Sequence, residues 1–207
     1  MLLNEVAPRM VAYGFEPKVK GQSVYRKTAE GHWAFHVSFM RHEHDLDVTA
    51  DMAVRIDAIE DLVNQYDEGL KPSEKRRTTT LGAELGNLSV RAPLKWTLRT
   101  TSDVPEVVDD LVRSFGEIGL PYLKSHARIK EAYKLLLSDA PEDRRHAPII
   151  GARYMRVLAA SYLLKSAEFE KLAEEYEVEL SKVNDLYSAD FKALAAGLIQ
   201  RNRVSGP

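Results

Sequence analysis

Cysteine is absent from the 207 residues of this chain. Without thiols the protein can form no disulfide, bind no metal through thiolates and use no cysteine nucleophile. Long hydrophobic runs are missing as well, because no apolar stretch approaches the roughly 18 residues that a membrane-spanning helix needs. The N-terminal sequence MLLNEVAPRM has a glutamate where a signal peptide needs an unbroken apolar segment. We therefore expect a cytoplasmic protein with no membrane partner.

An excess of charge of either sign is also missing. The sequence has 29 lysines and arginines against 31 aspartates and glutamates, which gives a net charge of −2. This balance provides no overall attraction for nucleic acid or an acidic membrane. The sequence contains no Gly-x-Gly-x-x-Gly, no Walker lysine and no Gly-x-Ser-x-Gly. It thus lacks the usual phosphate cradle and the nucleophile elbow, and we expect no cofactor.

The segment from residue 32 to residue 52 predicts a β-hairpin. Up to Arg41, apolar residues recur with the period of two that marks a half-buried strand, and from Leu46 they resume with the opposite parity. The apolar positions are Trp33, Phe35, Val37, Phe39, Leu46, Val48, Ala50, Met52 and Val54. If Arg41 pairs with Leu46, all of them lie on one face, and His36 lies opposite Asp51 on the other face.

Further strands and helices follow from the same periodicities. Strands are expected near 23–28, 79–84 and 95–100, and helices at 2–13, 55–66, from Asp103 to a stop at Gly119 and Pro121, and at 125–137. The fold class is therefore α+β, with a mainly antiparallel sheet of about five strands covered on one face by helices, and an all-helical C-terminal tail.

A charged segment with two prolines at residues 138–148 predicts a boundary. It separates an α+β domain at 1–137 from a helical extension at 149–207. Within the extension, helices are expected at 154–164 and 168–180, with a last one from near Ser188. Their apolar stripes are too extensive for solvent, so we expect this extension to pack on the first domain.

Four short motifs resemble those of an uncharacterised bacterial family. They are Gly14-Phe15, Tyr25-Arg26, Trp96-Thr97-Leu98 and Gly119-Leu120-Pro121-Tyr122-Leu123. In this order, over roughly residues 2–137, the chain is similar to the domain-of-unknown-function family numbered 4304. The resemblance implies a fold and brings no reaction and no site residues. It also implies a role of the accessory or immunity type.

The histidine-rich turn of the hairpin is a candidate metal site. His42 and His44 lie one residue apart and so share a face, and Asp45 and Asp47 follow. Zinc requires three or four such ligands converging at about 2.0–2.3 Å. At a hairpin turn, however, His42, His44 and Asp47 would be exposed and without supporting hydrogen bonds. We therefore expect a solvated turn and no tightly bound metal.

Two further groups have both a functional and a structural interpretation. His36 opposite Asp51, beside Ser38, has the residue types of a catalytic triad, but it is also an ordinary cross-strand polar pair. Arg76 and Arg77 belong to the basic segment 71–77, which could contact phosphates or form a solvated loop. Aromatic stacking partners are lacking near these arginines, so nucleic-acid binding is not the favoured interpretation.

Since every candidate site has an ordinary structural explanation, we expect a non-enzymatic protein-interaction role, immunity-like or accessory, with an unknown protein partner. The alternative is a hydrolase or metal-dependent enzyme that uses His36, Asp51 and the His42/His44 hairpin. A third interpretation is a weak nucleic-acid binder that uses Arg76 and Arg77.

Overall fold

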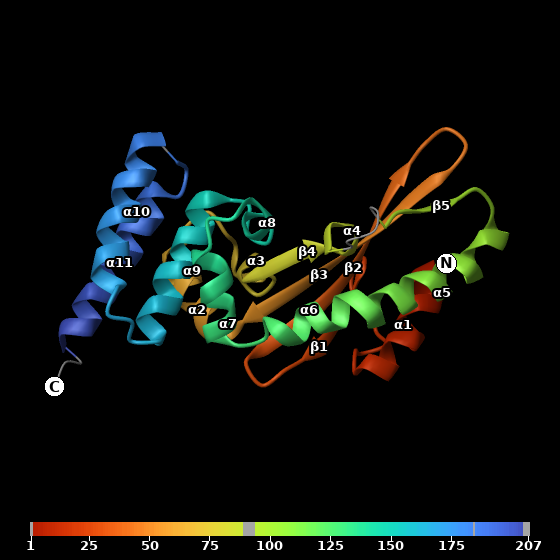
Figure 1. Cartoon of the computed structure of the whole chain (residues 1–207), viewed down its shortest axis with the longest axis horizontal. Helices are drawn as coiled ribbons and strands as arrows, with labels where there is room; N and C mark the ends of the chain where they lie inside the picture. The colour runs from red at the N-terminus through yellow and green to blue at the C-terminus, as the bar shows by residue number, and fades with distance from the viewer. Residues whose placement is uncertain (1, 89–93, 184, 205–207) are drawn as a thin grey trace. The chain divides into compact units, whose positions relative to one another are not determined.

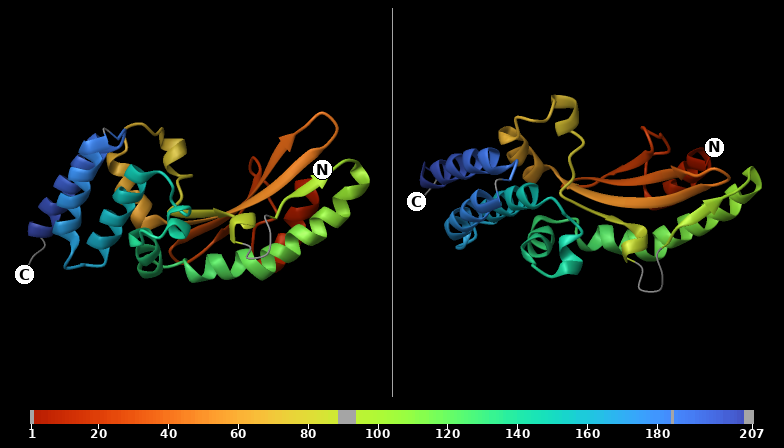
Figure 2. Two further views of the ribbon diagram at one scale, coloured as in Figure 1. Left: turned by 45° about the horizontal axis from the view of Figure 1, so that its top comes forward. Right: turned by 90° about the horizontal axis from the view of Figure 1, so that it is seen from above.

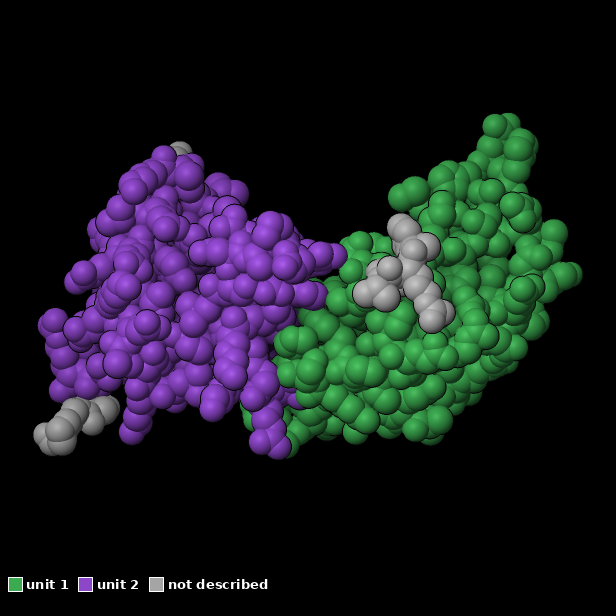
Figure 3. All heavy atoms as spheres, viewed as in Figure 1, with its two compact units in different colours: residues 1–54, 82–126 green, residues 55–81, 127–207 purple. Residues whose placement is uncertain are grey.

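The computed structural model describes residues 2–88, 94–183 and 185–204. The chain forms two compact units (Figure 3): residues 1–54 with 82–126 make unit 1, and residues 55–81 with 127–207 make unit 2. The predicted α+β class is confirmed, because a five-stranded sheet is accompanied by many helices, including those at the C-terminal end (Figure 1). Among the helices of the described residues, none combines the length and the apolar character needed to cross a membrane.

The division into units differs from the boundary predicted at 138–148. Residues 55–81 and helix α7 (Ile129–Leu137) belong with the C-terminal helices. The reason is packing: α2 (Asp57–Tyr66) and α7 both lie against α9 (Ile150–Leu163). A segment rich in proline and charge marks a loop, but only the contacts of the helices decide which core they belong to.

The sheet has the order β1-β2-β3-β4, and β5 also pairs with β3. Its strands are β1 (Ser23–Lys27), β2 (Gly31–Arg41), β3 (Leu46–Ile56), β4 (Leu81–Glu84) and β5 (Trp96–Leu98). The pairs β1–β2 and β3–β5 are antiparallel. The predicted strand regions all contain strands, although β4 and β5 are shorter than expected.

The hairpin is present as predicted. Strands β2 and β3 have eleven residues each; β2 ends at Arg41 and β3 begins at Leu46. The backbone N–H of His42 donates to the carbonyl of Asp45 at 2.9 Å, which closes the turn and agrees with the pairing of Arg41 with Leu46. Phe35 is fully buried, as the alternation requires. The distance between His36 and Asp51 across the hairpin stays a prediction.

Unit 1 is built around one aromatic side chain, that of Phe115. Its ring makes edge-to-face contacts with the rings of Tyr13, Phe15 and Phe35, at centroid distances of 5.2, 5.6 and 5.1 Å. These residues bring together the N-terminal helices, the sheet and the long helical segment. The helices of this unit are α1 (Leu2–Met10), η1 (Val11–Tyr13), α4 (Leu85–Leu88), η2 (Thr101–Asp103), α5 (Val104–Ser114), η3 (Phe115–Gly119) and α6 (Leu120–Ser125).

The predicted helix stop at Gly119 and Pro121 is wrong. The chain continues from α5 through the π-helical segment η3 into α6, and Figure 2 shows these as one long rod. Pro121 lies directly after the π-helical turn, so the missing N–H coincides with a local departure from regular α-helical geometry within the continuous segment. A Cβ atom at Gly119 would lie 2.8 Å from a ring carbon of Phe115. This glycine therefore serves close packing instead of ending a helix.

Unit 2 is mostly helical, and α9 lies at its centre, in contact with α2, α7, α10 and α11. The rings of Tyr154 on α9 and Tyr176 on α10 stack at 3.8 Å. The basic segment 71–77 contains one helical turn, α3 (Pro72–Lys75). The remaining helices are α3 (Pro72–Lys75), α8 (Pro141–Arg144), α10 (Phe169–Val183) and α11 (Ser188–Val204).

Candidate functional site at the hairpin tip

The turn of the hairpin gathers a group of possible metal ligands, but not the predicted one. His42, Asp45 and Asp47 each offer one ligand atom, and these atoms lie within 4.8 Å of one another. His44 is not part of the group. Its side chain is 86% exposed, and its ring nitrogen lies 3.7 Å from a carboxylate oxygen of Glu43. His44 was one of the candidate ligands, and the structure directs its side chain into solvent instead of toward the group.

Asp47 is held by three neighbours. Lys95 Nζ donates to Oδ2 at 2.7 Å, and Thr97 Oγ1 donates to Oδ1 at 2.8 Å. His42 Nε2 lies 2.9 Å from Oδ2. The hydrogen bonds from Lys95, Thr97 and His42 hold the pKa of Asp47 well below its usual range, although burial acts the other way. The expectation that the turn lacks supporting hydrogen bonds is therefore wrong for Asp47 and His42.

This arrangement bears directly on metal chemistry. The ammonium group of Lys95 already neutralises the carboxylate of Asp47, so an incoming cation would have to displace it. Thr97 faces Asp47 in the antiparallel pairing of β3 with β5. The cluster therefore joins two strands at the hairpin tip and fixes the ring of His42. The expectation that it binds no metal tightly stays a prediction.

The predicted His36–Asp51 group is not assembled as a triad. His36 Nδ1 lies 2.9 Å from the hydroxyl oxygen of Ser23, its partner on β1. Ser38 Oγ donates instead to Asp51 at 3.4 Å. The histidine and the aspartate thus use different hydroxyls. The contact of Ser23 with His36 could not be predicted from the hairpin alone. Ser23 belongs to β1, and the register of β1 against β2 is set by the assembled sheet.

The predicted basic residues, Arg76 and Arg77, lie just after α3 and are exposed. Within the described residues neither forms an ion pair. They form a solvated surface as expected, and nucleic-acid binding through them stays untested.

An apolar hollow of about 320 Å³ lies beside the hairpin tip. Its walls come from α1, β2, β3, β5 and α5, and they consist of Leu2, Leu3, Phe39, Leu46, Leu98 and Val104. Four of these side chains, Leu3, Phe39, Leu46 and Leu98, are only half-buried. The hollow therefore exposes aliphatic and aromatic surface in a concave shape, which favours contact with another apolar group.

A polar groove of about 560 Å³ adjoins this hollow and shares Leu46, Leu98 and Val104 with it. Its other lining residues are Arg41, His42, Glu43, His44, Asp45, Arg99, Thr100 and Thr101. The turn of the hairpin and the loop between β5 and α5 lie at the same end of unit 1 in the views of Figures 1 and 2. We call the hollow and the groove together the hairpin-tip surface. The sequence did not indicate the hollow, because five separate elements build it.

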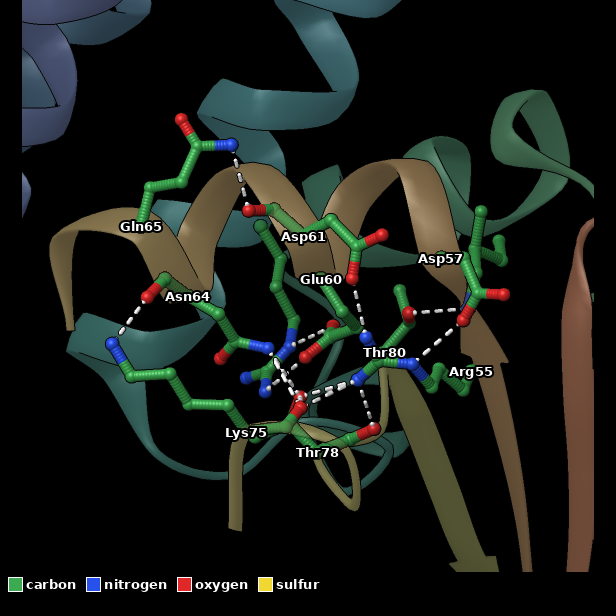
Figure 4. Close-up of polar contacts among 11 residues, drawn as sticks. Arg55, Asp57, Glu60, Asp61, Asn64, Gln65, Lys75, Thr78 and Thr80 are labelled. Atoms are coloured by element: carbon green, nitrogen blue, oxygen red, sulfur yellow. Dashed lines mark hydrogen bonds and ion pairs between the residues drawn. The ribbon is translucent and has the colours of Figure 1, made fainter. Parts of the chain in front are cut away.

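Unit 2 contains a second polar cluster (Figure 4), in which Arg55 and Glu60 are buried, whereas the carboxylates of Asp57 and Asp61 reach solvent. Arg55, only 5% exposed, donates to the carboxylates of Asp57 and Asp61 and to the backbone carbonyls of Lys75 and Thr78. Glu60 is fully buried and accepts two hydrogen bonds from Arg156 at 2.8 and 3.2 Å. The charged groups of this cluster are engaged with one another, so it stabilises the helices and does not offer a binding site.

No protein-family model, no curated protein sequence and no solved structure matches this chain. The resemblance to the family of unknown function therefore stays an expectation based on its four short motifs.

Proposed function

We propose that this protein is a non-enzymatic protein-interaction module, immunity-like or accessory, that binds its partner through the hairpin-tip surface. The observation that supports this proposal is an apolar hollow with half-buried walls beside a charged groove. Protein interfaces commonly combine an apolar centre, where a few anchor side chains bind, with a polar rim. The hollow is large enough for one side chain of a partner, and the groove can accept the polar residues beside it.

The charges around the hollow indicate what kind of segment would fit. Arg99 directly follows Leu98 of the hollow, and Arg41 immediately precedes the turn. Arg41 is exposed and has no ion-pair partner among the described residues. The acidic residues Glu43 and Asp45 line the same groove, in the turn itself, and the inference therefore rests on Arg41. We therefore infer a partner segment with a large apolar side chain close to an aspartate or glutamate, since arginine pairs well with carboxylates.

The enzyme alternative has less support. It requires His36, Asp51 and the His42/His44 pair to act together, but His36 contacts Ser23 and Asp51 contacts Ser38. His42 contacts Asp47, whose charge Lys95 already balances. The favourable observation for this alternative is the grouping of His42, Asp45 and Asp47, which zinc titration would test.

The experiment is a selection of short random peptides displayed on phage against the full-length protein. We expect the enriched peptides to place a large apolar residue next to aspartate or glutamate. Their affinity for Leu98→Glu should be about tenfold lower or weaker still, and tenfold corresponds to about 1.4 kcal/mol. A carboxylate in the hollow disfavours burial of the apolar side chain and repels the acidic residue of the peptide. Arg41→Gln should weaken binding less, and added salt should weaken it further.

A matched control is available on the same hairpin. Met40 is 64% exposed, and the alternation of β2 directs its side chain to the face opposite Phe39. Met40→Glu introduces the same charge outside the hollow and should leave peptide binding unchanged. Enriched peptides that bind Leu98→Glu as well as the wild-type protein, with both proteins folded by circular dichroism, would refute the proposal.

A further inference from the structure

A separate pocket of about 310 Å³ lies in unit 2, between the segment that precedes α9 and the first turn of that helix. One part of its lining is apolar and includes Pro148 and Ile150, of which Ile150 is 51% exposed. The other part carries the guanidinium groups of Arg144, Arg145 and Arg153. Pockets for small ligands commonly combine an apolar lining with a few convergent polar groups.

Arg153 is the unusual member of this group, because it is only 5% exposed. Its guanidinium donates to the backbone carbonyls of Leu135, Leu136 and Ser138 at the end of α7, and more distantly to that of Asp143. These bonds satisfy carbonyl groups at the helix C-terminus. All of these acceptors are neutral, so the charge of Arg153 is buried without a carboxylate bonded to it. Burial lowers the pKa of Arg153, and nearby Asp139 acts in the opposite direction.

The two other arginines are at the rim. Arg144 is 60% exposed and pairs with the 87% exposed carboxylate of Asp139 at 2.9 Å. Arg145 is exposed, and its Nε–H donates to the carbonyl of Glu142. Among the residues that line the pocket, three are cationic and Asp139 alone is anionic. The lining itself therefore carries a net positive charge, although the carboxylates of Asp143 and Glu179 lie close to Arg153 and Tyr154 behind it. A buried charge in a partly desolvated wall is screened less than a surface one.

We propose that this pocket binds a small organic anion, in which a carboxylate or phosphate group is attached to an apolar group. The anionic end would face Arg144, Arg145 and the buried charge of Arg153, and the apolar end would lie against Pro148 and Ile150. The ion pair of Arg144 with Asp139 is a model for the proposed contact, because in it a carboxylate of the protein itself binds the guanidinium group of Arg144. This site is independent of the hairpin-tip surface, which belongs to the other unit.

The test is a titration of the full-length protein with three probes of similar shape, in which binding is monitored through the amide NMR signals of the pocket residues. Benzoate carries a carboxylate, phenyl phosphate carries a phosphate, and benzamide is the neutral control. We expect saturable binding of at least one anion and binding of benzamide that is about tenfold weaker or absent. If benzoate binds more tightly than phenyl phosphate, the ligand is a carboxylic acid; if phenyl phosphate binds more tightly, the ligand is a phosphate ester. Equal binding of all three probes, or no saturable binding of either anion, would overturn the proposal.

Variants at the rim avoid the structural role of Arg153. Arg144→Gln and Arg145→Gln together should weaken binding of the anion by about tenfold, whereas Arg203→Gln removes a charge from an exposed position on α11 and should leave it unchanged. Asp139→Asn should tighten binding several-fold, because it frees Arg144 and removes the competing carboxylate. If Asp139→Asn and the double arginine variant bind the anion as the wild-type protein does, the arginines do not form the site.

Discussion

Each unit of this protein pairs a buried carboxylate with a cationic side chain close to threonine hydroxyls, but the two cations differ strongly in their exposure to solvent. In unit 1, Asp47 is bound by a lysine, Lys95, and a threonine, Thr97. In unit 2, Glu60 is bound by an arginine, Arg156, and the neighbouring hydroxyls of Thr78 and Thr80 also lower its pKa. The pKa of each carboxyl lies below its ordinary value. For Glu60 burial acts to raise the pKa, and Arg156 and the two hydroxyls outweigh it.

The difference lies in access to water. Lys95 is 55% exposed, whereas Glu60 is fully buried and Arg156 is 15% exposed. An ion pair that solvent reaches contributes little to stability, because water and salt screen it. A buried pair is costly to break, since removing one partner leaves an uncompensated charge in the interior. The same chemistry therefore joins two strands at the hairpin-tip surface in unit 1 and holds helices together in the core of unit 2.

The largest effect is expected for Arg156→Ala. It would leave the carboxylate of Glu60 buried without its partner, which typically costs about 3–5 kcal/mol in the free energy of unfolding. Urea denaturation followed by circular dichroism measures this loss. The matched control is the double change Glu60→Leu with Arg156→Met, which replaces the pair with apolar groups and should cost much less. A double variant as unstable as Arg156→Ala would show that packing, not charge, explains the loss.

A smaller loss is expected for Arg55→Ala, also in the buried cluster (Figure 4). Its guanidinium joins Asp57 and Asp61 to the segment at Thr78, so its removal leaves the carbonyl of Thr78 without that donor. Leaving one such buried group unsatisfied costs about 1–3 kcal/mol. The loss is measured by urea denaturation, as for Arg156.

Arg55→Lys serves as the control for this prediction. Lysine keeps the charge but cannot direct several donors in a fork, so it should recover only part of the loss. Full recovery with lysine would show that only the charge matters at this position.

The contrast between the units also explains what the sequence could reveal. The alternation of apolar residues around Arg41 and Leu46 predicted the hairpin correctly, because a period of two is a local property. The cationic partner of Glu60 lies 96 residues further along the chain, and two of the three partners of Asp47 lie 48 and 50 residues away; only His42 is near it in sequence. No local pattern marks such pairs, since they depend on how whole elements pack.

The wrong helix stop and the candidate ligand His44, which lies outside the group at the turn, have the same origin. Gly119 and Pro121 are helix-ending residues by local rules, but the packing of Phe115 against Gly119 continues the helical segment. His44 shares a strand face with His42 only if the strand runs through the turn, and the turn residues do not follow that alternation. Local chemistry thus predicted the elements of the site, and the arrangement of several elements decided which residues meet.

The smallest effect on stability is expected for Asp47→Asn, and its pH dependence is the informative part. The pKa of Asp47 is held below its ordinary value, about 3.8, chiefly by Lys95, then by Thr97 and His42. The unfolded chain therefore takes up the proton first as the pH falls, so the stabilisation is fully present above the ordinary pKa and is lost on acidification. The difference in unfolding free energy between wild type and Asp47→Asn should stay constant down to about pH 5 and then shrink progressively as the pH falls from about 5 to about 2. Glu43→Gln removes a charge from the same turn without touching Lys95 or Thr97, and it serves as the control. A difference for Asp47→Asn that stays constant over this range would mean that Lys95 does not hold the carboxylate in solution.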